Sequence, residues 1–255
     1  MNNDRTGFKQ KLNRLYQKER YNPKLIGLFV NPSYIIRKGL YKGIYANKDY
    51  LTGRLLDFGC GNKPYKEIFN VREYIGVDIK INGYEQNEKY IDVFYNGHTL
   101  PFDDNYFDSA FSSEVFDDIF NLEEILSELK RVLKPGGHIL ITYPFVWDEH
   151  DVPYDFARYT SFGMEHLLKE SGFDIVLAKK STAYLETVFQ MINAYIWQCI
   201  LPRNKKLKTA LVPFLITPFT ILGIGLSKIF PKNENFYHNN IIVAKKRVLQ
   251  NEPVA

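Results

Sequence analysis

The chain has 255 residues, which is long enough for one well-buried domain with additions and short for two full enzymatic domains. Hydrophobic residues make up 45% and charged residues 24%, so wholesale disorder is excluded. The net charge of +4 is too mild to indicate a nucleic-acid partner. The two cysteines do not indicate a disulfide framework, and the polar N-terminus lacks the apolar segment of a secretion signal, so we expect a cytoplasmic protein.

Residues 1–50 are rich in Lys, Arg, Tyr and Asn. The spacing of Leu12 and Leu15 is helical, whereas Pro23 and Pro32 break any single long helix. We therefore predict an N-terminal helical cover over residues 1–50, lying against the mouth of the site described next. A flexible lead-in is the alternative for the first residues of the chain.

A strand, a tight turn and the start of a helix come next. The apolar run from Arg54 to Phe58 is followed by Gly59 and Gly61, and Pro64 suits the first turn of a helix over residues 65–70. Glycines at such a turn let a ligand approach the backbone amides, although many turns of this kind serve packing alone.

A second strand, Tyr74 to Asp78, ends in an acid roughly 20 residues past the first glycine, where a ribose-binding carboxylate belongs. The pattern therefore indicates a cofactor that carries a nucleoside. A dinucleotide fingerprint would require a third glycine where this chain has Pro64, so a pyrophosphate is disfavoured. Asp57 at the mouth of the turn also repels phosphate, whereas it suits an ammonium group.

The following segments alternate between strands and helices, which predicts a mostly parallel sheet covered on both faces. The expected strands are a short edge strand near residues 90–93 and further strands at 108–112, 138–143 and 173–178. A helix is expected from Asn121 to Leu133, with Asn121 as its cap and Glu124 in the capping-box position. Another helix should run from Thr160 to Ser171.

Four ordered motifs, within residues 51–180, resemble those of the class I S-adenosylmethionine-dependent methyltransferases. They are Asp57-Phe58-Gly59-Cys60-Gly61, then Asp78, then Leu100-Pro101-Phe102-Asp103-Asp104-Asn105-Tyr106-Phe107-Asp108, and then Leu129-Lys130-Arg131-Val132-Leu133-Lys134-Pro135-Gly136-Gly137. The resemblance implies an α/β fold with a Rossmann-like seven-stranded, mostly parallel sheet whose last strand is antiparallel. It also implies S-adenosyl-L-methionine as the cofactor.

The same resemblance assigns cofactor-binding roles to the matching positions. These positions are Asp57, Gly59, Cys60, Gly61, Asp78, Asp92, Val93, Ser113 and Glu114. The glycine turn would lie against the methionine part, Asp57 would receive its ammonium group, and Asp78 would accept both ribose hydroxyls. Asp92 matches the acid that contacts the adenine amino group, with Val93 covering the ring, although a solvated loop acid is the alternative. The last two positions would line the methionine end.

The segment after the strand at 138–143 contains the candidate catalytic residues. His150 is flanked by acids that can orient it, so we predict it as the general base, with Asp155 and Arg158 orienting it or holding the acceptor. A structural ion pair between Asp155 and Arg158 is the alternative. Many relatives carry a His within the stretch that here reads Glu114 to Asp118, so no base is carried over from there. One His among acids without a set ligand spacing does not indicate a metal, and none is expected.

A hydrophobic insert is expected between the last two strands, because the candidate for the final strand, residues 240–244, comes late in the chain. Residues 183–231 contain two apolar segments, Thr187 to Pro202 and Thr209 to Ser227, joined by a basic linker. The second is long enough for a membrane span. The strands on either side must join the same sheet, which argues against a single crossing.

Within the first apolar segment, Gln190, Asn193 and Gln198 fall on one polar stripe, which suits a surface-lying helix. We therefore predict a monotopic or re-entrant insert that docks on a membrane. A pair of buried helices forming a lid or a dimer interface is the alternative.

The sequence as a whole predicts an O-methyltransferase acting on a hydroxyl of a sugar or lipid-linked glycan at the inner face of the membrane, an acceptor indicated only by analogy to a subgroup of these enzymes. Methylation of a quinone or isoprenoid is a second hypothesis, and a non-catalytic cofactor-binding protein at a membrane is a third. The expected core covers residues 51–182 and 232–248, followed by a tail at 249–255. An oligomer is left open.

Overall fold

The structure is a computed structural model that describes residues 18–80 and 88–248. The helical spacing at Leu12 and Leu15 lies outside the described residues. The chain divides into two compact units. Met1–Lys42 with Lys180–His238 form the first, called the helical unit, and Gly43–Lys179 with Asn239–Ala255 form the second, called the sheet unit.

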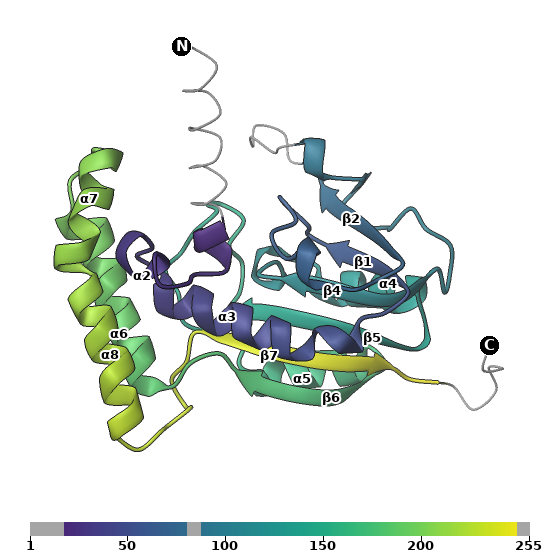
Figure 1. Cartoon of the computed structure of the whole chain (residues 1–255). Helices are drawn as coiled ribbons and strands as arrows, with labels where there is room; N and C mark the ends of the chain where they lie inside the picture. The colour runs from purple at the N-terminus through teal and green to yellow at the C-terminus, as the bar shows by residue number, and fades with distance from the viewer. Residues whose placement is uncertain (1–17, 81–87, 249–255) are drawn as a thin grey trace, which may run out of the picture. The chain divides into compact units, whose positions relative to one another are not determined.

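The sheet unit is built on a seven-stranded sheet in the order β3-β2-β1-β4-β5-β7-β6. The strands are β1 (Arg54–Phe58), β2 (Glu73–Ile79), β3 (Val93–Tyr95), β4 (Phe107–Ser113), β5 (Leu133–Pro144), β6 (Phe173–Lys180) and β7 (Asn239–Lys246). The strands from β1 to β5 pair in parallel, whereas β7 runs antiparallel to β5 and lies between β5 and β6 (Figure 1). The predicted fold class is confirmed.

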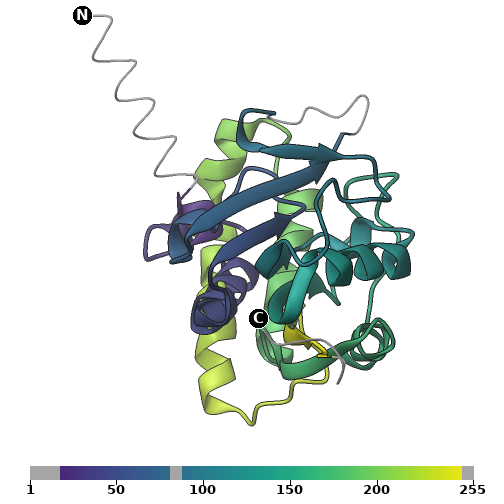
Figure 2. The same cartoon turned by 90° about the vertical axis from the view of Figure 1, so that its right-hand side faces the viewer.

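Helices α4 (Leu122–Val132) and α5 (Ser161–Glu170) cover one face of this sheet (Figure 2). The buried residues of α4 recur at helical spacing and are Leu122, Ile125, Leu126, Leu129 and Val132. They pack on alternate strand residues such as Leu56 and Phe58 in one apolar core. Thr160 caps α5, because its hydroxyl accepts a hydrogen bond from the Gly163 amide at 3.1 Å.

The helix predicted over residues 65–70 is only a single 3-10 turn, Lys66–Ile68. Tyr65 and Phe69, on either side of this turn, are both buried, and their rings contact Phe111 of β4. The segment is short and is anchored at both ends in the core, so it has no room to continue as an α-helix before β2 begins.

Two further local predictions are wrong. The edge strand starts at Val93 instead of ending there, because Asp92 is held back against β2 by its Oδ2 atom, which accepts the Gly76 amide at 2.7 Å. Asn121 precedes α4 but makes no side-chain cap. Its amide group instead donates to the Gly97 carbonyl at 3.2 Å and to Glu124.

The helical unit contains α2 (Gly27–Val30), the start of α3 (Tyr34–Asn47), α6 (Tyr184–Tyr195), a π-helical turn (Ile196–Ile200), α7 (Lys205–Leu215) and α8 (Thr217–Ile229). The helices α7 and α8 follow one another end to end beside α6 (Figure 1). The helical insert between the last two strands is therefore confirmed. The prediction that the polar stripe faces outward is wrong for Gln190 and Asn193, which are fully buried in α6, whereas Gln198 in the π-helical turn is exposed.

Candidate active site

A cavity of about 480 Å³ lies at the carboxyl ends of the central parallel strands, in the sheet unit. This is the place where open α/β sheets bind their ligands. Of the predicted cofactor residues, Gly59, Gly61, Asp78 and Glu114 line it. They follow or end strands β1, β2 and β4, so the sheet brings together residues that are far apart in the sequence.

The glycine turn after β1 is shaped by its surroundings. Gly59 has a φ of +70°, and a Cβ atom there would lie 2.4 Å from Val115, so only glycine fits. The Gly59 and Cys60 amides donate to the Val77 carbonyl at 2.9 and 3.1 Å, which fixes the turn to β2. A Cβ atom on Gly61 would meet nothing within 4 Å, so the backbone there faces open space.

Asp78 ends β2 with both carboxylate oxygens oriented by backbone amides. Its Oδ2 accepts the Gly61 amide at 2.9 Å and its Oδ1 accepts the Ile79 amide at 2.8 Å. Burial raises the pKa of this carboxyl, although the two amides oppose the shift. Each oxygen keeps a lone pair for one further donor, so the residue fits the vicinal hydroxyls of a ribose. The residues present therefore fit S-adenosylmethionine.

Glu114 follows β4 with a φ of +58° and is held on two sides. Thr142 of β5 donates to its Oε1 at 2.8 Å, and Asn239 of β7 donates to its Oε2 at 2.6 Å. These bonds direct a fixed carboxylate to the cavity wall, where a cationic group of a ligand would be received.

The other five predicted cofactor residues, Asp57, Cys60, Asp92, Val93 and Ser113, do not line the cavity. Asp57 is buried and accepts a hydrogen bond from the Tyr74 hydroxyl, and burial raises its pKa to about 7. Asp92 forms an ion pair with Lys63 at the amino end of β3, so Ile91 and Tyr95 line the cavity in place of Asp92 and Val93. Ser113 shares a hydrogen bond with Thr142 at 2.8 Å.

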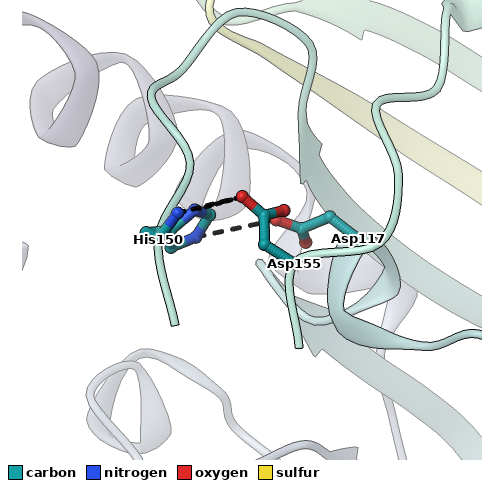
Figure 3. Close-up of side chains that lie close together, drawn as sticks. All are labelled: Asp117, His150 and Asp155. Atoms are coloured by element: carbon teal, nitrogen blue, oxygen red, sulfur yellow. Dashed lines mark hydrogen bonds and ion pairs between the residues drawn. The ribbon is translucent and has the colours of Figure 1, made fainter. Parts of the chain in front are cut away.

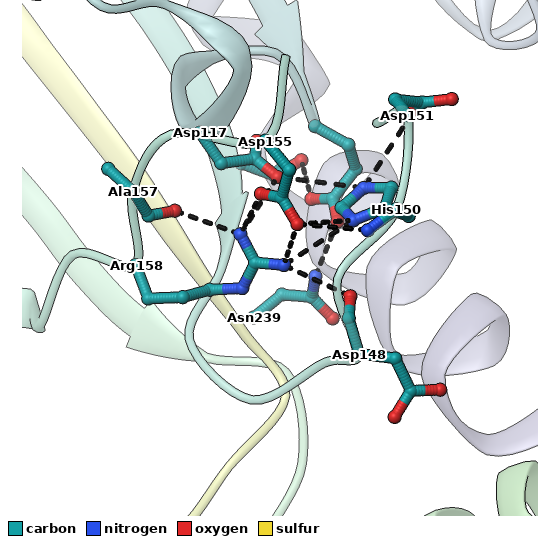
Figure 4. Close-up of polar contacts among 10 residues, drawn as sticks. Asp117, Asp148, His150, Asp151, Asp155, Ala157, Arg158 and Asn239 are labelled. Carbon is teal, nitrogen blue, oxygen red and sulfur yellow. Dashed lines mark hydrogen bonds and ion pairs between the residues drawn. The ribbon is translucent and has the colours of Figure 1, made fainter. Parts of the chain in front are cut away.

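The three predicted catalytic residues lie together. His150 Nδ1 is 3.2 Å from Asp155 Oδ2, which also accepts the His150 backbone amide at 3.0 Å (Figure 3). Arg158 binds both oxygens of Asp155 and donates to the Asp148 carbonyl at 3.1 Å (Figure 4). The guanidinium lowers the pKa of Asp155 to about 2, so this acid is ionised and fixes the orientation of His150.

Sequence reasoning missed two acids beside this cluster. Asp117 is 1% exposed, and its Oδ2 lies 3.7 Å from His150 Nε2. Asp118 lines the cavity. Burial raises the pKa of Asp117 to about 6 and, with the neighbouring Asp117 charge, that of Asp118 to about 8. In the sequence, only the position of Asp117 and Asp118 after β4 indicates that they lie near the site. That position does not predict that they are buried.

Asp117, His150 and Asp155 offer ligand atoms that all lie within 4.8 Å of one another, which is close enough to surround a cation. Arg158 already supplies a positive charge there. Its guanidinium binds Asp155 and lies 3.7 Å from Asp117. A divalent ion between Asp117, His150 and Asp155 would have to sit beside that guanidinium, so the charge balance there favours the arginine over a metal. A second group of this kind is formed by Asp118, His150 and Asp151.

The outer part of the cavity combines rings with acids. Tyr154 and Phe156 line it together with Phe120, which is 84% exposed. The ring centroids of Phe120 and Phe156 are 5.6 Å apart. Asp118 and Asp151 lie in the same lining, and among the described residues of the lining none is Lys or Arg. The cavity therefore suits cationic or neutral hydroxylated ligands and disfavours anions.

Comparison with known proteins matches this core to methyltransferases. Residues 56–141 match the family model described as a methyltransferase domain. A 24-methylenesterol C-methyltransferase from Arabidopsis thaliana is 35% identical over 109 residues, which cover 38% of this chain and 30% of that protein. A ubiquinone/menaquinone biosynthesis C-methyltransferase from Hahella chejuensis is 32% identical over 88 residues, covering 32% of this chain and 34% of that protein. The chain thus spans about a third of the length of these relatives.

Among solved structures, a phosphoethanolamine N-methyltransferase from Haemonchus contortus in complex with S-adenosyl-L-methionine superposes with a TM-score of 0.53. It shares 18% identity over 91% of this chain and 59% of that chain, so this likeness supports the fold alone. The family match over residues 56–141 shows a methyltransferase domain in the core of the chain, and the sheet order and the cavity agree with it. Its cofactor is S-adenosylmethionine.

Proposed function

We propose that this chain is an S-adenosylmethionine-dependent O-methyltransferase whose acceptor is a hydroxyl group of a sugar or a lipid-linked glycan at the membrane surface. The observation that carries the proposal is a single cavity that joins the glycine turn and Asp78 to an acceptor side made of rings and acids. Such an acceptor places the protein in the cytoplasm, peripheral to the inner face of the membrane.

The acceptor side supports a sugar. The carboxyl groups of Asp118 and Asp151 can form hydrogen bonds with neighbouring hydroxyls, and Tyr154 and Phe156 offer ring faces to the C–H groups of a pyranose. Phosphate or carboxylate groups near the transfer point are disfavoured, because no Lys or Arg among the described residues lines the cavity. A lipid-linked glycan would therefore be bound with its phosphates outside the cavity.

Bound S-adenosylmethionine supplies a methyl group on a sulfonium, so the protein has to align the acceptor and remove one proton. His150 is proposed as the base. Asp155 holds its Nδ1 side, which leaves Nε2 to take the hydroxyl proton, and the buried Asp117, 3.7 Å from Nε2, stabilises the imidazolium that forms. Arg158 keeps Asp155 in place and ionised.

The cofactor roles of the remaining residues are part of the same proposal. Gly59, Gly61, Asp78 and Glu114 contact the cofactor directly, as lining residues of the cavity. Asp57, Cys60 and Ser113 stabilise the cavity wall without lining it. Asp57 is hydrogen-bonded to Tyr74, Cys60 belongs to the glycine turn, and Ser113 is hydrogen-bonded to Thr142. Asp92 and Val93 keep the adjoining strand in register with β2.

A second candidate is methylation of a quinone or another isoprenoid. It is favoured by the exposed rings at the cavity mouth and by the names of the sterol and quinone methyltransferases that match the core. The acids at the acceptor side favour the sugar over this alternative, because an isoprenoid offers few hydroxyl groups to them.

The test is product formation with a radiolabelled methyl donor and a membrane extract, with the Asp78→Asn variant as the negative control. Label released with the sugar by mild acid hydrolysis supports the proposal. Label that remains in the quinone fraction supports the second candidate. A protein that binds S-adenosylhomocysteine but transfers label to no fraction would be a non-catalytic cofactor-binding protein, and the proposal would fall.

A further inference from the structure

The polarity of α8 is the reverse of that of a helix in a water-soluble protein. Its buried positions carry small or hydroxylated residues, namely Thr217, Thr220, Gly223 and Ser227. Its exposed positions carry large apolar residues, namely Phe219, Ile221, Leu222 and Ile229. A helix that packs in water turns the second kind of residue inward. The outer side of α8 is therefore an exposed apolar surface.

The neighbouring helix α6 shows the same inversion. Asn193 is 0% exposed and donates to the Thr220 hydroxyl of α8 at 2.8 Å. Gln190 is also fully buried, accepting the Ile35 amide at 3.2 Å and donating to the Pro32 carbonyl at 3.0 Å. Inward polar side chains that bond helix to helix are typical of helices in lipid, where no water is available to satisfy them.

Small residues let these helices approach closely. A Cβ atom on Gly223 of α8 would lie 2.5 Å from the Cβ of Phe189 of α6. Close contact at a glycine, with larger side chains turned outward, is the usual packing of helices in membranes, because no hydrophobic effect drives their association there. The contact between α6 and α8 is thus made at small and polar positions, whereas the buried apolar cluster of this unit, Ile196, Leu201, Val212 and Ile216, lies near α7.

The length and the shape of the segment that forms α7 and α8 indicate whether it crosses the membrane or lies on its surface. Lys205–Ile229 is the one segment among the described residues that is long and apolar enough to cross a membrane, and only 28% of its most apolar window is buried. The segment breaks at Ile216, between α7 and α8. The helix α2 packs against it, with Leu28 accepting a hydrogen bond from Thr217 at 2.8 Å. One side is covered by protein, so the other can be covered by a single leaflet.

The α7 end of the insert carries positive charge. Arg203, Lys205 and Lys206, called the basic cluster, are exposed at the start of α7. Lys208 Nζ lies 4.4 Å from the centroid of the Trp197 ring. Lysine and arginine next to tryptophan are the residues that settle at the headgroup level of an anionic bilayer.

We propose that α7 and α8 form a monotopic docking surface for an anionic phospholipid bilayer. The exposed side chains of Phe214, Phe219, Ile221, Leu222 and Ile229, called the docking face, enter the outer part of one leaflet, and the basic cluster contacts the headgroup phosphates. This inference rests on the membrane-surface part of the proposed function and does not depend on which acceptor is methylated. It excludes a transmembrane crossing by the insert.

Vesicle flotation of the full chain tests the proposal. Vesicles of phosphatidylcholine with phosphatidylglycerol should carry the wild-type protein, and vesicles of phosphatidylcholine alone should carry it less. The variant Phe219→Gln/Leu222→Gln/Ile229→Gln should bind at least about tenfold more weakly. The matched control Phe162→Gln, at a position that is 80% exposed on α5 in the sheet unit, should bind like the wild type.

A second pair of variants tests the charge. Lys205→Glu/Lys206→Glu should lose about tenfold or more on anionic vesicles and nothing on neutral ones, whereas Lys179→Glu, on an exposed position of β6, should change neither. The proposal is overturned if the wild-type protein does not bind the anionic vesicles. It is also overturned if the docking-face variant floats with them as well as the wild type does. A wild-type dimer that the docking-face variant converts to a monomer without any vesicle binding overturns it too, because a second copy then covers this face.

The affinity for S-adenosylhomocysteine, measured on each variant, separates this inference from the proposed function. All docking and control variants should keep the wild-type affinity, because none of the changed residues lines the cofactor cavity. Unchanged cofactor affinity without vesicle binding removes the docking surface and leaves the methyltransferase in place.

Discussion

The carboxylate of Asp78 offers the sharpest test of the cofactor site. In the wild type, its two oxygens each accept one backbone amide, from Gly61 and Ile79. The change Asp78→Asn removes the charge and replaces one acceptor oxygen with an amide nitrogen. Whichever way the new side chain turns, that nitrogen faces a backbone N–H group, so two donors oppose one another. The fixed geometry toward the ribose is lost as well.

The size of the effect follows from the hydrogen bonds involved. A hydrogen bond to a charged group contributes about 1.5–3 kcal/mol, and the variant loses at least one such bond to a ribose hydroxyl. Since 1.4 kcal/mol corresponds to a factor of ten in Kd, S-adenosylhomocysteine should bind about ten- to a hundredfold more weakly.

Isothermal titration calorimetry measures this difference directly. The matched control is Asp174→Asn, because Asp174 is an exposed acid that pairs only with Arg247, at 2.8 Å, in the bonds the structure describes, and lies outside the cavity lining. The control should bind as the wild type does. If Asp78→Asn keeps the wild-type Kd and the same melting temperature, Asp78 does not hold the ribose and the assignment of the cavity is wrong.

Three further predictions concern the base, the metal and the buried acid. His150→Ala should lower turnover by about 10²–10⁴-fold and spare the affinity for S-adenosylhomocysteine, because His150 lies beside Asp118 and Asp151 at the acceptor side and is not one of the residues proposed to hold the cofactor; retained turnover refutes its role as base. EDTA should leave turnover unchanged, because Arg158 already balances Asp155, and a loss that Mg²⁺ restores would show a metal. Burial raises the pKa of Asp57 to about 7, so its contribution to stability is present at low pH and is lost as the pH rises from about 4 to about 7. The variant Asp57→Asn lacks this loss, so its free energy of unfolding relative to the wild type should rise between pH 5 and pH 8 in urea titrations; a constant difference contradicts the burial effect.

The elements that could be predicted from the sequence are those whose apolar pattern is long and regular. The strand Arg54–Phe58 has the predicted bounds, and α4 begins and ends within one residue of its prediction. The helix α5, predicted from Thr160 to Ser171, spans Ser161–Glu170, and the Thr160 hydroxyl caps it by accepting a hydrogen bond from the Gly163 amide. In these segments the local sequence pattern and the tertiary packing favour the same secondary structure, so the sequence pattern alone predicts it.

Short segments were predicted less well, because contacts from elsewhere in the chain decide them. The stretch after Pro64 keeps only one turn, since Tyr65 and Phe69 are drawn into the core. The start of β3 is set by the bond from the Gly76 amide to Asp92, which no local pattern reveals. Asn121 has the side chain of a helix cap, but its amide group donates to the Gly97 carbonyl and to Glu124, and its oxygen accepts no helix N–H.

The candidate site could be predicted where a motif fixes backbone geometry. The glycine turn and Asp78 meet in the cavity because adjacent parallel strands end at the same edge of the sheet. Burial could not be predicted in the same way. Asp117 is hidden behind His150, and the polar residues of α6 are turned inward, because each is enclosed by parts of the chain far away in the sequence.

We assign the cavity at the ends of β1 and β2 to the nucleoside of S-adenosylmethionine. A crystal structure of the full chain grown with S-adenosylhomocysteine would show whether this assignment holds. We expect the nucleoside in this cavity, with both ribose hydroxyls donating to the carboxylate oxygens of Asp78 and the methionine part beside Gly59 and Glu114. A nucleoside bound elsewhere, or an Asp78 side chain turned away from the ribose, would contradict it.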